Sequence, residues 1–202
     1  MDVKLAELTM QERYKIIVGL IVPRPIAWVS TVNAAGINNC APYSFFNAFS
    51  EEPPLCVLGF GRRPDDLTKH SLNNILETGE FVVNLVDEAT ANAMHLSSEN
   101  IPENESEFTL AGLTPAPATL VRHPRIKEAV AGFECKVWKS IEVSHERVLV
   151  IGEMLLAFAR EGVIDPQNKR ISDAAYHPIG RLYANRYCTT RERFTLPGDL
   201  PI

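Results

Sequence analysis

Short runs of apolar, β-branched and aromatic residues are the commonest pattern along the chain, and they predict strands. Residues 26–32 form one such run, and 33–36 supplies turn residues before a second run begins at Ile37, so this pair predicts a β-hairpin. Residues 55–60 and 81–86 are further runs. The second of these is apolar at nearly every position, as expected of a strand that is buried on both faces.

The clearest alternation of apolar and polar positions lies between residues 133 and 143. Apolar side chains occupy one parity and polar side chains the other: Phe133, Cys135, Val137, Ile141 and Val143 against Glu134, Lys136, Ser140 and Glu142. This period of two predicts a strand with one face directed into a core. A polar link at 144–147 separates it from the apolar segment 148–158, so we expect two antiparallel strands.

Helical periodicity is restricted to three places. The expected helices are 12–17, 69–77 with Gly79 as its C-cap, and 88–96. Between 97 and 117 the composition shifts to Ser, Glu, Asn and Pro, which predicts a long surface excursion. Six or more short strands without regular strand–helix alternation predict a mainly β fold, a closed or partly closed antiparallel barrel with a few peripheral helices, and residues 1–202 are expected to form one domain.

Composition and charge exclude several classes of protein. The 202 residues carry 20 Lys and Arg against 25 Asp and Glu, a net charge of −5, and no run of like charges is longer than a pair. Nucleic-acid binding is not expected, because it depends on clustered cations. The longest apolar stretch, 16–23, is far shorter than the roughly 20 residues that span a bilayer, and the N-terminus lacks the apolar centre of a secretory signal. We therefore expect a cytoplasmic protein without membrane contact.

Neither the cysteines nor the histidines have the spacing of a metal site. The four cysteines are widely separated, and the five histidines lie in different segments without an i, i+4 pair. We expect reduced thiols and no metal. Residues 59–64 begin like a dinucleotide fingerprint, but Pro64 stands where the third glycine is needed, so a Rossmann site is rejected.

Residues 62–71 combine cations and hydroxyls at the start of a predicted helix. The first backbone N–H groups of a helix are unsatisfied and carry partial positive charge, so an anionic phosphate fits there. The alternative is a capped and solvated helix start in which Thr68 or Asp66 is the N-cap.

Residues 41–50 place four aromatic side chains among small hydroxyl and amide groups. A flat heteroaromatic ring binds well to this mixture of apolar faces and polar edges. The alternative is that the aromatic side chains fill the barrel core. One predicted strand, 55–60, joins this segment to 62–71, so a ligand with a ring and a phosphate could contact both, and FMN has that shape.

At these residues the chain resembles the flavin reductase family with the FMN-binding split-barrel fold, which includes flavoredoxin-like proteins. The resemblance extends from about Tyr14 to Leu196, the expected barrel core, and is carried by the stretches 21–31, 41–47, 79–85, 111–115 and 150–153. It implies a homodimer that holds FMN noncovalently near the subunit interface. The residues that it implies for cofactor binding are Trp28, Ser30, Thr31, Tyr43, Ser44, Phe45, Phe46, Asn47, Arg62, Lys69 and Ser71.

The same resemblance implies an oxidoreductase that takes hydride from NADH or NADPH and passes electrons to a free flavin, a partner oxygenase or another electron-transfer protein. Hydride passes directly between the two rings, so no catalytic residue is named. Two alternatives stay open: a flavoredoxin-like electron-transfer protein reduced by a protein donor, and a noncatalytic FMN-binding module. Tyr183 stands where many relatives carry glycine, and a ring there would narrow the nicotinamide face. Arg147 has the spacing at which shorter relatives carry a histidine linked to nicotinamide, a role that is not transferred here.

Overall fold

The hairpin expected near the N-terminus is formed by β1 (Ala27–Val32) and β2 (Asn38–Tyr43), which pair antiparallel in the computed structural model. The structure describes residues 1–63, 65 and 67–198. The hairpin belongs to a larger sheet whose other strands are β3 (Phe46–Glu51), β4 (Pro54–Gly61), β5 (Glu80–Leu85), β8 (Ala131–Ser144) and β9 (Arg147–Ala159). In the described residues the order is β2–β1–β5–β8–β9–β4–β3, and all pairings are antiparallel.

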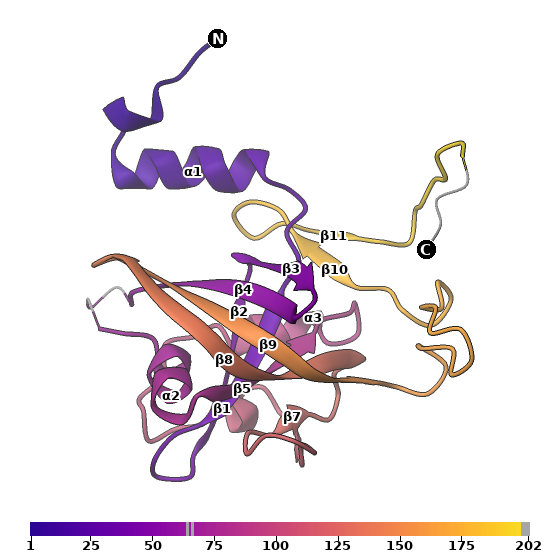
Figure 1. Ribbon diagram of the computed structural model, residues 1–202. Coiled ribbons are helices and arrows are strands. Elements are labelled where there is room, and N and C mark those ends of the chain that lie inside the picture. The colour runs from indigo at the N-terminus through magenta and orange to yellow at the C-terminus, as the bar shows by residue number, and fades with distance from the viewer. Residues whose placement is uncertain (64, 66, 199–202) are drawn as a thin grey trace.

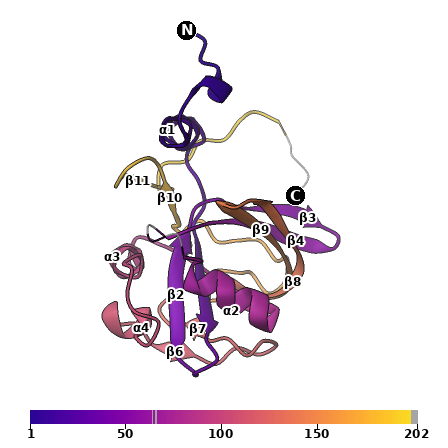
Figure 2. The same cartoon turned by 90° about the vertical axis from the view of Figure 1, so that its left-hand side faces the viewer.

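The sheet is strongly curved, as Figures 1 and 2 show. Its edge strands, β2 and β3, do not pair with each other in the described part of the chain, so the barrel is partly closed. Two small strand pairs accompany it, β6 (Pro115–Ala116) with β7 (Arg125–Ile126) and β10 (Ile179–Arg181) with β11 (Tyr187–Thr189). The predicted mainly β, antiparallel architecture with few helices is confirmed.

A helix is present at each of the three expected positions, although its first and last residues differ from those expected. They are α1 (Met10–Leu20), α2 (His70–Thr78), α3 (Ala91–Leu96) and a short α4 (Glu107–Leu110), after a 3₁₀ turn at Leu5–Glu7. A capping box between Thr9 and Glu12 starts α1 earlier than expected. Gly79 ends α2 with φ 72°, the left-handed conformation that favours glycine, as predicted.

The expected excursion at 97–117 is only partly on the surface. It contains α4, whose Glu107 and Phe108 are buried, so this segment is folded onto the barrel rather than extended into solvent. Its short apolar piece is the part that packs, because Phe108 joins a cluster on the outer side of β1.

Two apolar clusters lie on opposite faces of β1. The interior cluster includes Val29 of β1, Phe60 of β4 and Phe81 of β5, and Leu72 of α2 closes one end of it. Trp28 points the other way, into a cluster covered by α3, α4 and the small strands. Successive side chains of a strand alternate between faces, so cover on both sides explains why β1 is buried almost throughout.

The strand predicted from the alternation at 133–143 exists. Its predicted inner face is confirmed at Phe133, Cys135 and Val137, which pack in or against the interior cluster, and is wrong in its outer half. β8 pairs with β9 as expected, yet Ile141 and Val143, expected in the core, are 38% and 57% exposed, and Trp138 is 56% exposed. Glu134, expected to face solvent, is fully buried. Irregularities in the β8–β9 register change which side chains face inward, and the outer half of β8 runs beyond the core.

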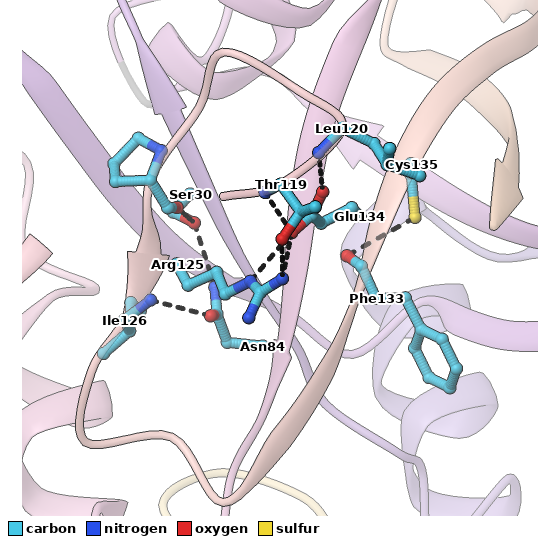
Figure 3. A network of polar contacts seen from close by, with 10 residues as sticks. Ser30, Asn84, Thr119, Leu120, Arg125, Ile126, Phe133, Glu134 and Cys135 are labelled. Atoms are coloured by element: carbon cyan, nitrogen blue, oxygen red, sulfur yellow. Dashed lines mark hydrogen bonds and ion pairs between the residues drawn. The ribbon is translucent and has the colours of Figure 1, made fainter. Parts of the chain in front are cut away.

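Buried Glu134 holds the segment before β7 against the sheet (Figure 3). Its carboxylate accepts hydrogen bonds from the backbone N–H groups of Thr119 and Leu120, at 2.9 and 2.6 Å, and from the guanidinium of Arg125. A buried carboxylate is tolerated only when it is paired and hydrogen-bonded in this way.

Helix α1 stands apart from the sheet in both views of the chain (Figures 1 and 2). Val18 is its single buried residue, and Met10, Tyr14 and Leu20 are exposed. Among the described residues, no helix combines the length and the apolar character needed to cross a bilayer.

Candidate functional site

A small pocket of about 80 Å³ lies at the N-terminus of α2, and we call it the cationic pocket. Its lining brings together both segments that the sequence singled out. The segment 41–50 contributes Ala41, Pro42 and Tyr43, and the segment 62–71 contributes Arg63, Lys69, His70 and Ser71. The rest of the lining consists of Asn39, Glu107 and residues 97–101.

The helix start in this pocket is open. Lys69 is the N-cap residue of α2, and its side chain accepts no capping hydrogen bond. The alternative N-cap at Thr68 is therefore wrong, and Asp66 lies outside the described residues. An uncapped helix N-terminus presents backbone N–H groups and a positive dipole end to an anion.

Three basic side chains surround the open helix end. Arg63 donates from Nη1 to Nε2 of His70 at 2.6 Å, and because a guanidinium only donates, this nitrogen of His70 is unprotonated. Burial, followed by the charge of Arg63, lowers the pKa of both His70 and Lys69. Asp65 pairs with Arg63 at 3.1 Å, whereas the polar partner of the Lys69 ammonium among the described residues is the amide oxygen of Asn100, at 3.4 Å. The ammonium of Lys69 is thus available to an anion.

A buried polar network fixes the floor of the cationic pocket. The hydroxyl of Ser71 donates to Oδ1 of Asn39 at 2.6 Å, and the amide of Asn39 donates to both carboxylate oxygens of Glu107 at 2.8 Å. Thr31 also donates to Oδ1 of Asn39, at 3.2 Å, and accepts from Asn74. Burial raises the pKa of Glu107. The proton of Ser71 therefore points to Asn39, and its backbone N–H is the group that faces the helix opening.

Arg62 is not brought to the cationic pocket. Its Nε donates to the backbone oxygen of His145, at 2.6 Å, in the turn between β8 and β9. Its neighbour Arg63 lines the pocket instead. Consecutive residues in an extended segment point to opposite sides, so sequence alone could not tell which arginine faces the helix.

Trp28, Ser30 and Thr31 lie behind the site rather than in it. All three are fully buried. Nε1 of Trp28 donates to Ser97 at 2.8 Å, and the hydroxyl of Ser30 donates to the backbone oxygen of Pro124 at 2.6 Å (Figure 3). Ser97 belongs to the wall of the cationic pocket, so Trp28 and Thr31 support that wall and floor from inside.

The aromatic side chains of 41–50 divide between the core and a groove. Tyr43 packs in the barrel against Phe60, with ring centroids 4.4 Å apart, and burial raises its pKa. For Tyr43, the alternative that the aromatic side chain fills the barrel core is therefore correct. Phe45, Phe46 and Phe49 instead line a groove of about 640 Å³, the aromatic groove, with Ser44, Asn47, Arg147 and residues of α1's C-terminal end, β4 and β9.

A third cavity of about 300 Å³ connects the other two. This junction pocket shares Pro42 and Ser98 with the cationic pocket and shares Arg24 and Ser44 with the aromatic groove. Tyr14, His95, Arg181 and Tyr187 are also among its lining residues. The three cavities therefore form a continuous surface from the start of α2 to the aromatic groove.

Arg24 organises this junction, although it was not among the expected site residues. Its guanidinium donates to the carbonyl oxygens of Val18, Ile21 and Leu182 at 2.6, 2.8 and 2.6 Å, and to Ser44 at 3.4 Å. It thereby joins the end of α1, the C-terminal hairpin and the loop after β2. The only sequence signal was its place in the stretch 21–31, because charge alone does not mark a buried arginine.

Tyr183 does not narrow any of these cavities. It lies exposed in the turn between β10 and β11, where the guanidinium of Arg186 is 5.5 Å from the centre of its ring. Tyr187 of the same hairpin lines the junction pocket instead.

Comparisons with known proteins agree with this arrangement. A family model described as "Flavin reductase like domain" matches residues 19–186. An uncharacterized protein of Aquifex aeolicus is 42% identical over 174 residues, covering 86% of this chain and 88% of that protein.

Two solved structures share the fold, the split barrel of flavin reductases, and are more than 30% identical in sequence to this chain. The 2-nitrobenzoate 2-nitroreductase NbaA of Pseudomonas fluorescens has a TM-score of 0.88 and 38% identity, with 100% of this chain and 98% of that chain covered. Nitrilotriacetate monooxygenase component B of Bacillus cereus has a TM-score of 0.90 and 34% identity, with 97% and 98% covered.

Proposed function

The chain belongs to the flavin reductase-like family, and from this premise we propose that it is an FMN-dependent oxidoreductase that accepts hydride from NADH or NADPH. The observation that carries the proposal is the continuous surface that joins an open, basic helix N-terminus to an aromatic groove. A family of flavin reductases implies a flavin, and the shape and charge of this surface support FMN.

The cationic pocket fits the phosphate of FMN. Lys69 supplies an ammonium that has no carboxylate partner among the described residues, and Arg63 supplies a second cation. The backbone N–H groups of His70 and Ser71 supply the positive end of the helix dipole. Arg62 takes no part in this proposal, because it is turned to His145. The hydroxyl of Ser71 would need to turn from Asn39 to reach a phosphate oxygen.

The ring of the cofactor fits the surface beyond the cationic pocket. Pro42 and Ser98 flank the passage into the junction pocket, and Ser44 to Asn47 form the near wall of the aromatic groove. These residues supply apolar faces together with hydroxyl, amide and backbone groups for the polar edge of a flavin. Trp28, Ser30 and Thr31 are proposed to position this wall from inside the barrel.

The protein's own contribution is to bind and orient. Bound FMN supplies a ring that accepts hydride and passes electrons onward. Arg24 keeps the loop at Ser44 and the C-terminal hairpin at a fixed separation, so two flat rings can be held face to face between them. Among the described residues no group in these cavities is proposed to act as an acid or base.

The acceptor is proposed to be a free flavin or a partner oxygenase. The relative from Bacillus cereus is itself one component of a monooxygenase, which supports delivery of electrons to a second protein. A homodimer is proposed as well, because the outer half of β8 and helix α1 carry exposed apolar side chains that a second copy could cover.

Cofactor binding is tested by replacing Lys69. Lys69→Ala removes a charge-assisted contact, so FMN affinity should fall by about ten- to a hundredfold. Lys127→Ala, at an exposed lysine of the segment after β7, is the matched control and should leave affinity unchanged. Affinity is measured by titrating FMN with the flavin-free protein and following the change in FMN fluorescence. Equal affinities in the two variants would remove Lys69 from the site.

Anaerobic stopped-flow reduction tests the electron donor. The FMN-loaded protein should lose its visible absorbance on mixing with NADH or NADPH at a rate compatible with turnover. Reduction by dithionite or a reduced ferredoxin, but by neither nicotinamide, would instead support the electron-transfer alternative. An isolated protein that neither contains nor takes up flavin would contradict the proposal altogether.

A further inference from the structure

Arg147 is a half-buried cation at the wall of the aromatic groove. It begins β9, directly after the β8–β9 turn, and its guanidinium lies 4.9 Å from the centre of the Phe45 ring. Within the described residues, its guanidinium donates one hydrogen bond, a long one of 3.4 Å from Nη1 to the carbonyl oxygen of Gly59. Among the described residues, no carboxylate lies within ion-pair distance of it. A desolvated guanidinium without a carboxylate is unusual in a folded protein.

Two glycines of β4 leave the space that the guanidinium of Arg147 and the ring of Phe45 occupy. A Cβ on Gly61 would lie 3.3 Å from Nη1 of Arg147, and a Cβ on Gly59 would lie 3.2 Å from Cβ of Phe45. Strand β4 therefore carries no side chain at the two positions over which Arg147 and Phe45 lie. The contact of the guanidinium with the Phe45 ring restricts the orientation of the cation.

The charged residues that line the aromatic groove are all basic. No acidic residue is among those that line it, and its two cations are Arg24 and Arg147. Arg24 is already bonded to three carbonyl oxygens, which leaves Arg147 as the cation able to meet a ligand. Burial lowers the pKa of Arg147, and the charges of Tyr14 and Glu146 offset this only in part. The whole chain is acidic, with a net charge of −5, so the positive charge of the groove is a local feature.

We propose that the aromatic groove is a binding site for a small planar aromatic carboxylate. The ring of this ligand packs among Phe45, Phe46 and Phe49, and its carboxylate receives paired N–H donors from Arg147, a geometry that a guanidinium provides and an ammonium does not. Because the groove shares Ser44 and Arg24 with the junction pocket, the ligand lies beside the proposed flavin. The ligand's place beside a flavin rests on the proposed function, whereas its binding does not.

The lining of the groove favours this class of ligand over a phosphate. One available cation within a mostly apolar wall matches a single negative charge attached to a ring. The cationic pocket, with Lys69, Arg63 and a helix N-terminus, is built differently and suits an anion of higher charge.

Binding of benzoate and of benzamide, its neutral counterpart of nearly equal shape, tests the proposal. Calorimetry on the FMN-loaded wild-type protein should show benzoate binding at least about tenfold more tightly than benzamide, as expected for a hydrogen-bonded charge pair. Arg147→Gln should abolish this preference, and Arg147→Lys should restore only part of it. Arg122→Gln, at an exposed arginine paired with Glu80, is the matched control and should keep the preference.

Several outcomes would overturn the proposal. Equal binding of benzoate and benzamide to the wild-type protein would do so without any variant, as would a preference that survives in Arg147→Gln. Tighter binding of phenyl phosphate than of benzoate would show a phosphate site instead. FMN affinity is measured in the same variants, so that a failure of cofactor binding is recognised separately from a failure of the proposal. A large loss of FMN affinity in Arg147→Gln would show that Arg147 contacts the flavin itself, and would also overturn the proposal.

Discussion

At the scale of single residues, His123 shows how the surroundings of a side chain set its chemistry. It is fully buried, with Nδ1 accepting from the backbone N–H of Val32 at 2.9 Å and Nε2 at 2.9 Å from the hydroxyl of Thr78. Because Nδ1 accepts, the neutral ring carries its proton on Nε2. Burial lowers the pKa of His123 from its ordinary 6.5 to about 4.

This shift predicts that the protein loses stability in acid. Between pH 6.5 and about 4 the unfolded chain binds a proton at this histidine that the folded chain does not, so the contribution is intact above pH 6.5 and falls as pH falls through this window. A difference of this size amounts to about 3 kcal/mol below pH 4. Urea unfolding from pH 8 to pH 4 measures it, with His145→Gln, at an exposed histidine, as the control. If His123→Gln and His145→Gln have the same pH dependence as each other, the prediction fails.

The expected site residues show what residue-level reasoning could reach. Lys69 and Ser71 were found from the charge and hydroxyl pattern and do line a pocket. Arg62 and Arg63 were indistinguishable by that pattern, since which of them faces α2 depends on the path of the chain beyond β4. Glu107 gave no sequence signal, and the only signal for Arg24 was its place in the stretch 21–31. Asn39, the partner of Glu107, and Leu182, one partner of Arg24, lie far away from them in the sequence.

At the scale of elements, close packing around the barrel constrains β9. Gly152 lies opposite Phe81, and a Cβ on it would be 2.4 Å from the end of that fully buried ring. A ring in the core has no room to move away, so the backbone or its neighbours must shift.

Gly152→Ala is therefore expected to destabilise the fold by about 1–3 kcal/mol. Gly19→Ala is the matched control. A Cβ on Gly19 meets no atom within 4 Å, and alanine in the last turn of α1 should favour that helix by up to about 1 kcal/mol. Urea midpoints of the two variants measure the difference. A stability of Gly152→Ala equal to that of the wild-type protein would show that the core around Phe81 is looser than the structure indicates.

At the scale of the whole molecule, the exposed apolar side chains of the outer β8 strand need an explanation. Trp138, Ile141 and Val143 form this strip, and exposed apolar groups gathered on one element mark interaction surfaces. The proposed homodimer gives them a partner, because a second copy can bury them.

Replacing two of these residues by lysine tests that assignment. Ile141→Lys with Val143→Lys places two charges in the proposed interface, and sedimentation velocity should show a monomer where the wild-type protein is a dimer. Ile171→Lys, at a residue that is 52% exposed in the segment after β9, is the control and should stay dimeric. A double variant that remains a dimer would place the interface elsewhere, and a monomeric wild-type protein would contradict the homodimer itself.

The sequence by itself determined the strands of the main sheet other than β3, the main hairpins, the position of α2 and the two segments that meet at the cationic pocket. These features depend on local patterns, namely alternation, turn residues and the glycine after α2, which act over a few neighbouring positions. Only the tertiary structure decided that Ile141 and Val143 lie outside the core, that Arg63 rather than Arg62 faces α2, and that Arg24 and Arg147 border the cavities. The physical reason is that burial and pairing depend on strand register and on contacts between residues far apart in the chain, which no local pattern encodes.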